Sequence, residues 1–110
     1  MGTSIMDQVA EAKAVVPDIS PSEVKALMGR EDVLIIDVRD DGEVASTGKV
    51  QGALHVSRGM LEFRADETTP YHDEALSKDK TIILYCASGG RAALSGKALL
   101  DLGYKDVRNF

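Results

Sequence analysis

The sequence predicts an α/β fold in which a mainly parallel sheet carries helices on both faces. Continuous β-branched and aliphatic runs at 33–38 and 81–85 lack polar alternation, which is typical of strands buried on both sides. Segments with helical spacing separate the strands, as the crossovers between parallel strands require. At 110 residues, the chain is long enough for one domain with its own core.

Two helices are expected before the first strand. A short amphipathic helix is expected within residues 6–15, and we interpret residues 1–17 as an N-terminal extension. Residues 20–23, Ser-Pro-Ser-Glu, fit a capping box with proline at the first helical position. A second helix is therefore predicted from this point to Gly29, which is a typical helix stop.

The remaining elements alternate between strands and helices. The expected strands are 33–38, 53–56, 81–85 and 105–110. Asp40, Asp41 and Gly42 predict a turn after the first of these strands. Short helices and loops are expected over 58–76, and the strongest helical pattern lies between Arg91 and Leu102.

The clearest chemical signal lies directly after the third strand, at the only cysteine, Cys86. Open α/β sheets hold their ligands at the carboxyl ends of their strands. The backbone N–H groups that follow, at the start of a helix, can form an anion-binding cradle that also stabilises a thiolate. The residues of this expected cradle are Ala87, Ser88, Gly89, Gly90 and Arg91.

A plainer interpretation exists for the same segment. A lone cysteine at the end of an apolar strand is often an inert core residue. Ser88 could cap the following helix, and Arg91 could pair with a carboxylate that braces the loop. Two adjacent glycines, however, cost backbone entropy unless an unusual conformation or a close ligand approach needs them, which favours a functional loop.

Composition narrows the range of partners and compartments. A net charge of −5 argues against nucleic acid as a partner, and the apolar runs are too short to span a membrane. A single cysteine excludes an internal disulfide and suits the reducing cytoplasm. His55 and His72 lack the spacing of metal ligands, so neither a metal nor another cofactor is expected.

Three segments, in this order, resemble motifs of the rhodanese family, in particular its single-domain bacterial sulfurtransferases. They are 37–43 with its Asp-Val-Arg, 48–63 with its Gly-Ala-x-His, and the cysteine loop 86–91. The resemblance covers residues 18–110 and implies a rhodanese domain with an open, mainly parallel five-stranded sheet. Family members usually continue with a further helix, so we expect a domain shortened at its C-terminus, or a sheet face covered by another chain such as a second copy.

The resemblance also implies an activity. Cys86 would take a sulfane sulfur from thiosulfate or a related anion as a persulfide and pass it to a thiol or cyanide. Asp37 and Arg39 are expected to form a supporting ion pair, whereas Arg58 could either bind substrate anions at the rim or form a salt bridge.

Three alternatives to this enzyme stay open. The chain could be a persulfide carrier loaded by a protein donor, or a non-catalytic rhodanese-like module. It could also be a cysteine phosphatase or arsenate reductase, but those enzymes cradle the oxyanion in a loop one residue longer. Here four residues separate Cys86 from Arg91, and this tighter loop favours a single sulfur atom over a phosphate.

Overall fold

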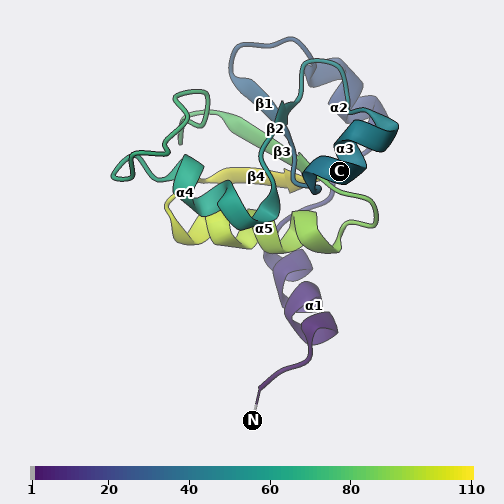
Figure 1. The fold of residues 1–110 in the computed structure, drawn as a ribbon. Coiled ribbons are helices and arrows are strands. Elements are labelled where there is room, and N and C mark those ends of the chain that lie inside the picture. The colour runs from purple at the N-terminus through teal and green to yellow at the C-terminus, as the bar shows by residue number, and fades with distance from the viewer. Residues whose placement is uncertain (1) are drawn as a thin grey trace.

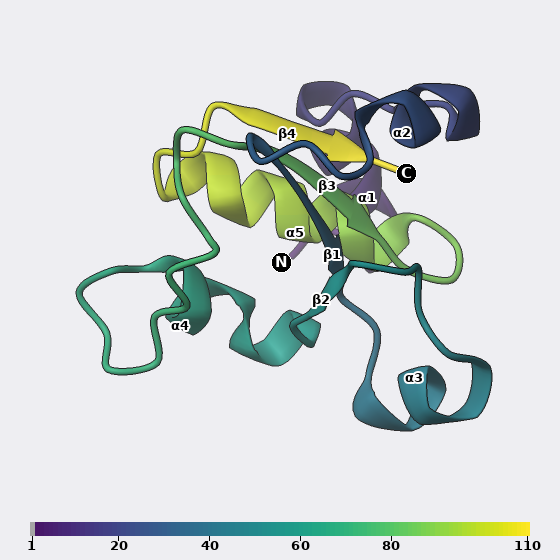
Figure 2. The same ribbon diagram turned by 90° about the horizontal axis from the view of Figure 1, so that it is seen from above.

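A four-stranded parallel sheet forms the centre of the protein in the computed structural model, which describes residues 2–110 (Figure 1). The strands are β1 (Val33–Asp37), β2 (Leu54–His55), β3 (Thr81–Tyr85) and β4 (Asp106–Asn109). They lie in the order β2-β1-β3-β4, and every pairing is parallel (Figure 2). The helices are α1 (Ile5–Val15), α2 (Pro21–Leu27), α3 (Asp41–Thr47), η1 (Arg58–Met60), α4 (Leu61–Ala65) and α5 (Gly90–Asp101).

Helices cover both faces of this sheet, which confirms the predicted α/β class. Along β3, successive side chains point to opposite faces, as strand geometry requires. Ile82 and Leu84 pack into one core cluster with residues of α4 and α5. Ile83 and Tyr85 pack into a second cluster with residues of α2 on the other face (Figure 1). The unbroken apolar run of β3 is therefore explained by burial on both sides.

The five-stranded sheet implied by the family resemblance is wrong for the described residues. Beside β4, where a fifth strand could pair, the described residues form only an isolated parallel bridge between Asp18 and Asn109. The Ile19 N–H donates to the Asn109 carbonyl at 2.9 Å, and the Asn109 N–H donates to the Pro17 carbonyl at 2.9 Å. Pairing stops there because Pro17 has no N–H to donate and Ser20 already caps α2.

The turn predicted at residues 40–42 is also wrong, because helix α3 begins at Asp41. The Asp40 N–H donates to Glu43 Oε1 at 3.2 Å, which is the backward half of a capping box. Aspartate favours both turns and helix N-termini, and the missed signal for the helix is Glu43, three residues after Asp40.

Helix α1 projects from the body of the protein, as Figure 1 shows, and it packs against α5. Val9 and Ala12 are buried on this helix, whereas Ile5 and Met6 are exposed. An added Cβ at Gly96 of α5 would lie 2.8 Å from both methyl groups of Val16, so the two segments approach closely. Within residues 2–110, no helix has the length and apolar character needed to cross a membrane.

Candidate active site

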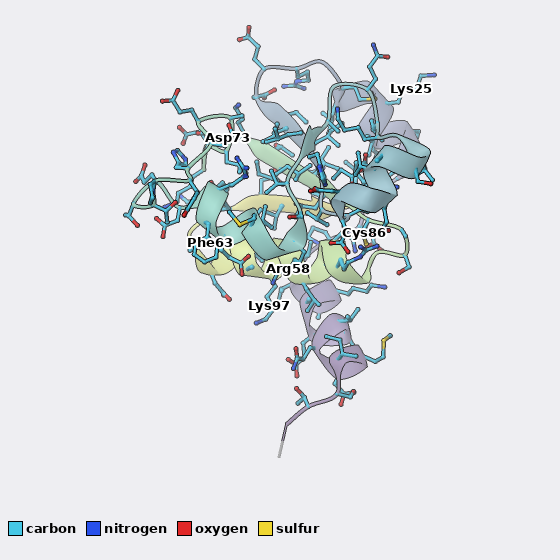
Figure 3. The ribbon with its side chains drawn as sticks, viewed as in Figure 1. Lys25, Arg58, Phe63, Asp73, Cys86 and Lys97 are labelled. Carbon is cyan, nitrogen blue, oxygen red and sulfur yellow. The ribbon has the colours of Figure 1, made fainter. Side chains whose placement is uncertain are left out.

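Cys86 lies at the carboxyl end of β3, directly before the loop that leads into α5 (Figure 3). Its side chain is half-buried. Its sulfur accepts two backbone hydrogen bonds, from the Gly89 N–H at 3.1 Å and from the Ala92 N–H at 3.4 Å. These donors place partial positive charge around the sulfur and stabilise negative charge on it.

The loop has this shape because Gly89 adopts a left-handed conformation, with a φ of +88°, just before α5. Residues with a Cβ rarely adopt this conformation, so glycine is needed here. The Asn109 Nδ2 donates to the Gly89 carbonyl at 3.1 Å and fixes the loop to the end of β4. Sequence reasoning missed Asn109, although a buried polar residue at the end of a strand is a signal that could have identified it.

Arg91 forms a bidentate ion pair with Glu43 of α3. Its Nη1 and Nη2 lie 2.6 and 3.0 Å from the two carboxylate oxygens. The hydrogen bonds from Arg91, together with the Asp40 N–H, hold the pKa of Glu43 at about 2, below its usual value of 4.5. The sequence left open whether Arg91 stabilises a bound anion or pairs with a carboxylate that braces the loop. The structure shows the pair with a carboxylate, which ties α3 to the first turn of α5.

Asp37 and Arg39 form the ion pair that the sequence suggested, beside the same loop. Arg39 Nη2 lies 2.7 Å from Asp37 Oδ2, and Asp37 is fully buried. Arg39 Nη1 donates to the Thr47 hydroxyl at 2.8 Å, and Nη2 also donates to the Gly48 carbonyl at 2.6 Å. Burial alone would raise the pKa of Asp37, but the hydrogen bonds from Arg39 outweigh it and lower this pKa. The pair thus braces the chain just after α3.

The Arg58 backbone N–H donates to the Val38 carbonyl at 3.1 Å, next to Asp37 and Arg39, but its side chain is paired elsewhere (Figure 3). Its Nη1 is 2.5 Å from Glu62 Oε1, one turn further along the chain. Arg58 is not among the described residues that line the two cavities at Cys86. The structure thus shows the salt bridge that the sequence left open for Arg58 and does not bring this arginine to the sulfur.

Two cavities meet at Cys86. The α3-side cavity has a volume of about 360 Å³ and includes Arg39, Lys49 and Tyr85 in its lining. The α1-side cavity has a volume of about 410 Å³ and is lined by Lys13, Asp18, Ile19, Cys86, Ala87, Ser88, Gly89, Asn109 and Phe110. A further cavity, beside Tyr104 and residues 65–79, does not include Cys86. Among residues 2–110, no group of three or more His, Cys, Asp or Glu side chains is arranged to hold a metal ion.

The half-buried cysteine thus lies under two backbone amides at the carboxyl edge of a parallel sheet, where open α/β sheets hold their ligands. The chain matches the rhodanese-like domain over residues 20–110, and it belongs to this family.

Relatives with several functions share this domain. A sulfurtransferase of Allochromatium vinosum is 31% identical over 90 residues, which cover 82% of this chain and 76% of that protein. A tRNA uridine(34) hydroxylase of Bartonella henselae is 35% identical over 103 residues, which cover 93% of this chain. The chain spans 33% of the length of that hydroxylase.

A solved structure from Rhodopseudomonas palustris has nearly the same fold. It superposes with a TM-score of 0.90 at 35% identity and covers 98% of this chain and 83% of that one. That protein is of unknown function and is described as a possible tyrosine phosphatase.

Proposed function

We propose that this chain transfers a sulfane sulfur from thiosulfate, or a related anionic donor, to a thiol or cyanide through a persulfide on Cys86. The observation that carries the proposal is the pair of N–H groups, from Gly89 and Ala92, that donate to the cysteine sulfur. The likeness to a sulfurtransferase along most of both chains supports the same chemistry.

In the first step, the Cys86 thiolate attacks the outer sulfur of thiosulfate. A new S–S bond forms on the cysteine while the S–S bond of thiosulfate breaks, and its electron pair leaves with sulfite. The negative charge moves from the cysteine sulfur to the terminal persulfide sulfur, which stays at the mouth of the loop. The N–H groups of the loop and the first turn of α5 favour this anion.

In the second step, a cyanide ion or a thiolate attacks the terminal persulfide sulfur. The S–S bond breaks, thiocyanate or a new persulfide leaves, and Cys86 is again a thiolate. The two half-reactions share one covalent intermediate, so steady-state kinetics are expected to be ping-pong.

The size of the loop supports sulfur over phosphate as the group that is transferred. Four residues separate Cys86 from Arg91, and the amides of Gly89 and Ala92 already donate to the sulfur itself. Arg91, which would contact phosphate oxygens in a phosphatase, is held by Glu43 instead. The matched part of the hydroxylases is a third of their length, so this likeness does not extend hydroxylation to the chain.

The test is thiocyanate formation from thiosulfate and cyanide by purified wild-type protein and by Cys86→Ser. We expect turnover from the wild type and none from the variant, with both proteins folded by circular dichroism. The double variant Cys86→Ser/Ser46→Cys moves the only thiol to an exposed site on α3 and is expected to be inactive.

Two outcomes would change the proposal. Full turnover by Cys86→Ser, or efficient hydrolysis of an aryl phosphate by the wild type, would contradict it. Weak turnover with thiosulfate but rapid loading of Cys86 from a protein persulfide would identify a sulfur carrier in place of a thiosulfate enzyme.

A further inference from the structure

We infer that Lys13, on helix α1, binds the anionic sulfur donor beside Cys86. This inference rests on the proposed sulfur transfer and names a residue that lies outside the matched rhodanese-like domain, residues 20–110. It adds α1 to the binding site of the domain.

The position of Lys13 beside Cys86 supports this role. Lys13 and Cys86 line the same cavity of about 410 Å³, together with Ser88 of the loop. An anion that approaches the sulfur through this cavity therefore comes between the loop amides and the lysine ammonium group. The amides contact the reacting sulfur, and the lysine is suited to the charged end of the donor.

The other cations near Cys86 are engaged by groups of the protein. Arg39 is paired with the buried Asp37, and Arg91 is held by both oxygens of Glu43. Lys49 donates to the Ala53 carbonyl at 2.7 Å. Across residues 2–110, no hydrogen bond or ion pair engages the Lys13 ammonium group. Among the described residues, Lys13 is thus the cation in the two cavities at Cys86 whose charged group has no hydrogen-bond or ion-pair partner in the protein.

Helix α1 is held in place by its packing against α5. Its residues Val9 and Ala12, and Val16 just beyond its end, are buried, and Lys13 follows Val9 by one helical turn. The side chain therefore starts at the border of the packed face and reaches past it to the cavity, as long cationic side chains do. The close approach at Gly96 holds this part of the helix against α5, whose first turn contributes to the loop.

The charges of the ligand and the protein agree with this role. Thiosulfate and the sulfite that leaves are both dianions, whereas the chain carries a net charge of −5. A local cation is needed to offset that repulsion. Asp18 lines the same cavity, and its carboxylate opposes an anion there. Removal of this carboxylate should therefore have the opposite effect to removal of Lys13.

The experiment compares the steady-state kinetics of wild-type protein with those of Lys13→Gln, Lys13→Arg and Asp18→Asn, with thiosulfate as the varied substrate. For Lys13→Gln, we expect a KM about three- to fivefold higher with kcat nearly unchanged, as suits one partly exposed charge pair. Lys13→Arg should retain most of the affinity, and Asp18→Asn should lower KM. The KM of Lys13→Gln should also respond less to added salt than that of the wild type.

Lys97→Gln is the matched control, since Lys97 is an exposed lysine of α5 that lies away from Cys86 (Figure 3). It removes the same net charge and should leave KM unchanged. An unchanged KM for Lys13→Gln, or an equal rise for Lys97→Gln, would overturn the role of Lys13 while wild-type turnover leaves the proposed function standing. Absence of sulfur transfer by the wild type would instead overturn the proposed function itself.

Discussion

The two cavities that meet at Cys86 differ in what their cations do. On the α3 side, Arg39 and Lys49 are both engaged with groups of the protein. On the α1 side, the structure gives Lys13 no such partner within residues 2–110. The cations on the α3 side therefore brace residues 47–53, whereas the lysine on the α1 side retains a charge that a ligand can use.

This difference shows that the number of cations near a site does not measure its affinity for anions. An arginine that is already paired contributes much less to ligand binding, because its charge is neutralised and its donors are occupied. The arginines named from the sequence, Arg39, Arg58 and Arg91, are all paired with carboxylates.

On the α3 side, Asp37→Asn should cause the largest loss of stability. Asp37 is fully buried and the Arg39 side chain is 13% exposed, so the substitution leaves a nearly buried guanidinium without its counterion. We expect the free energy of unfolding to fall by about 3–5 kcal/mol in urea titrations. The control is Asp32→Asn, which breaks the exposed pair with Arg30 and should cost less than about 1 kcal/mol. Equal losses in both variants would contradict the bracing role of Asp37.

On the α1 side, Gly96→Ala should disturb both stability and substrate affinity. The added Cβ would lie 2.8 Å from both methyl groups of Val16, whose branched, buried side chain has little room to move. The overlap costs about 1–3 kcal/mol, which exceeds the gain of about 1 kcal/mol from alanine in a helix. Because the helix that carries Lys13 is displaced, KM for thiosulfate should rise as well.

A rescue variant and a control variant test this prediction. Val16→Ala/Gly96→Ala relieves the overlap and should recover the KM. Gly42→Ala, in helix α3, places a Cβ with no atom within 4 Å and should leave both stability and KM intact. A Gly96→Ala protein with wild-type stability and KM would show that α1 does not depend on this contact.

The Arg91–Glu43 pair should produce a smaller effect that depends on pH. The pKa of Glu43 is lowered from 4.5 to about 2, so the folded state binds fewer protons than the unfolded state between these values. The stabilisation is therefore complete above pH 4.5 and is lost as the pH falls through about 2. Glu43→Gln should be less stable than the wild type at neutral pH, and the two proteins should converge in acid.

Denaturant titrations across this pH range measure that difference. Glu31→Gln is the control, since Glu31 is exposed and the described part of the chain shows no ion pair for it. A stability difference between Glu43→Gln and the wild type that stays constant down to pH 2 would rule out the ion pair as its source.

The parts of this protein that were predictable from sequence are those set by local pattern. The apolar run of β3 and the glycines after Cys86 predicted the strand and the loop, because burial on both faces favours such a run and Gly89, which has no Cβ, can adopt a positive φ. Most of the parts that were missed depend on contacts between distant segments. Arg91 and Glu43 are 48 residues apart, and nothing local to either residue specifies the pair.

The error at 40–42 has a local cause, because Asp-Asp-Gly favours a turn while Asp40 and Glu43 also fit a capping box. Contacts between distant segments explain the error in the fifth strand and the omission of Lys13. The fifth strand shrinks to one bridge because Pro17 limits pairing with β4. Lys13 lines a cavity at Cys86 because α1 packs against α5, in part through the fit of Val16 against Gly96, and shape complementarity of this kind is not visible in periodicity.

The most direct test of the central claim is the intact mass of the wild-type protein after incubation with excess thiosulfate and removal of the small molecules. We expect a gain of one sulfur atom, located on Cys86 by peptide mapping and removed by cyanide. The Cys86→Ser protein should show no gain. An unchanged wild-type mass under these conditions, or an equal gain by Cys86→Ser, would contradict sulfur transfer through Cys86.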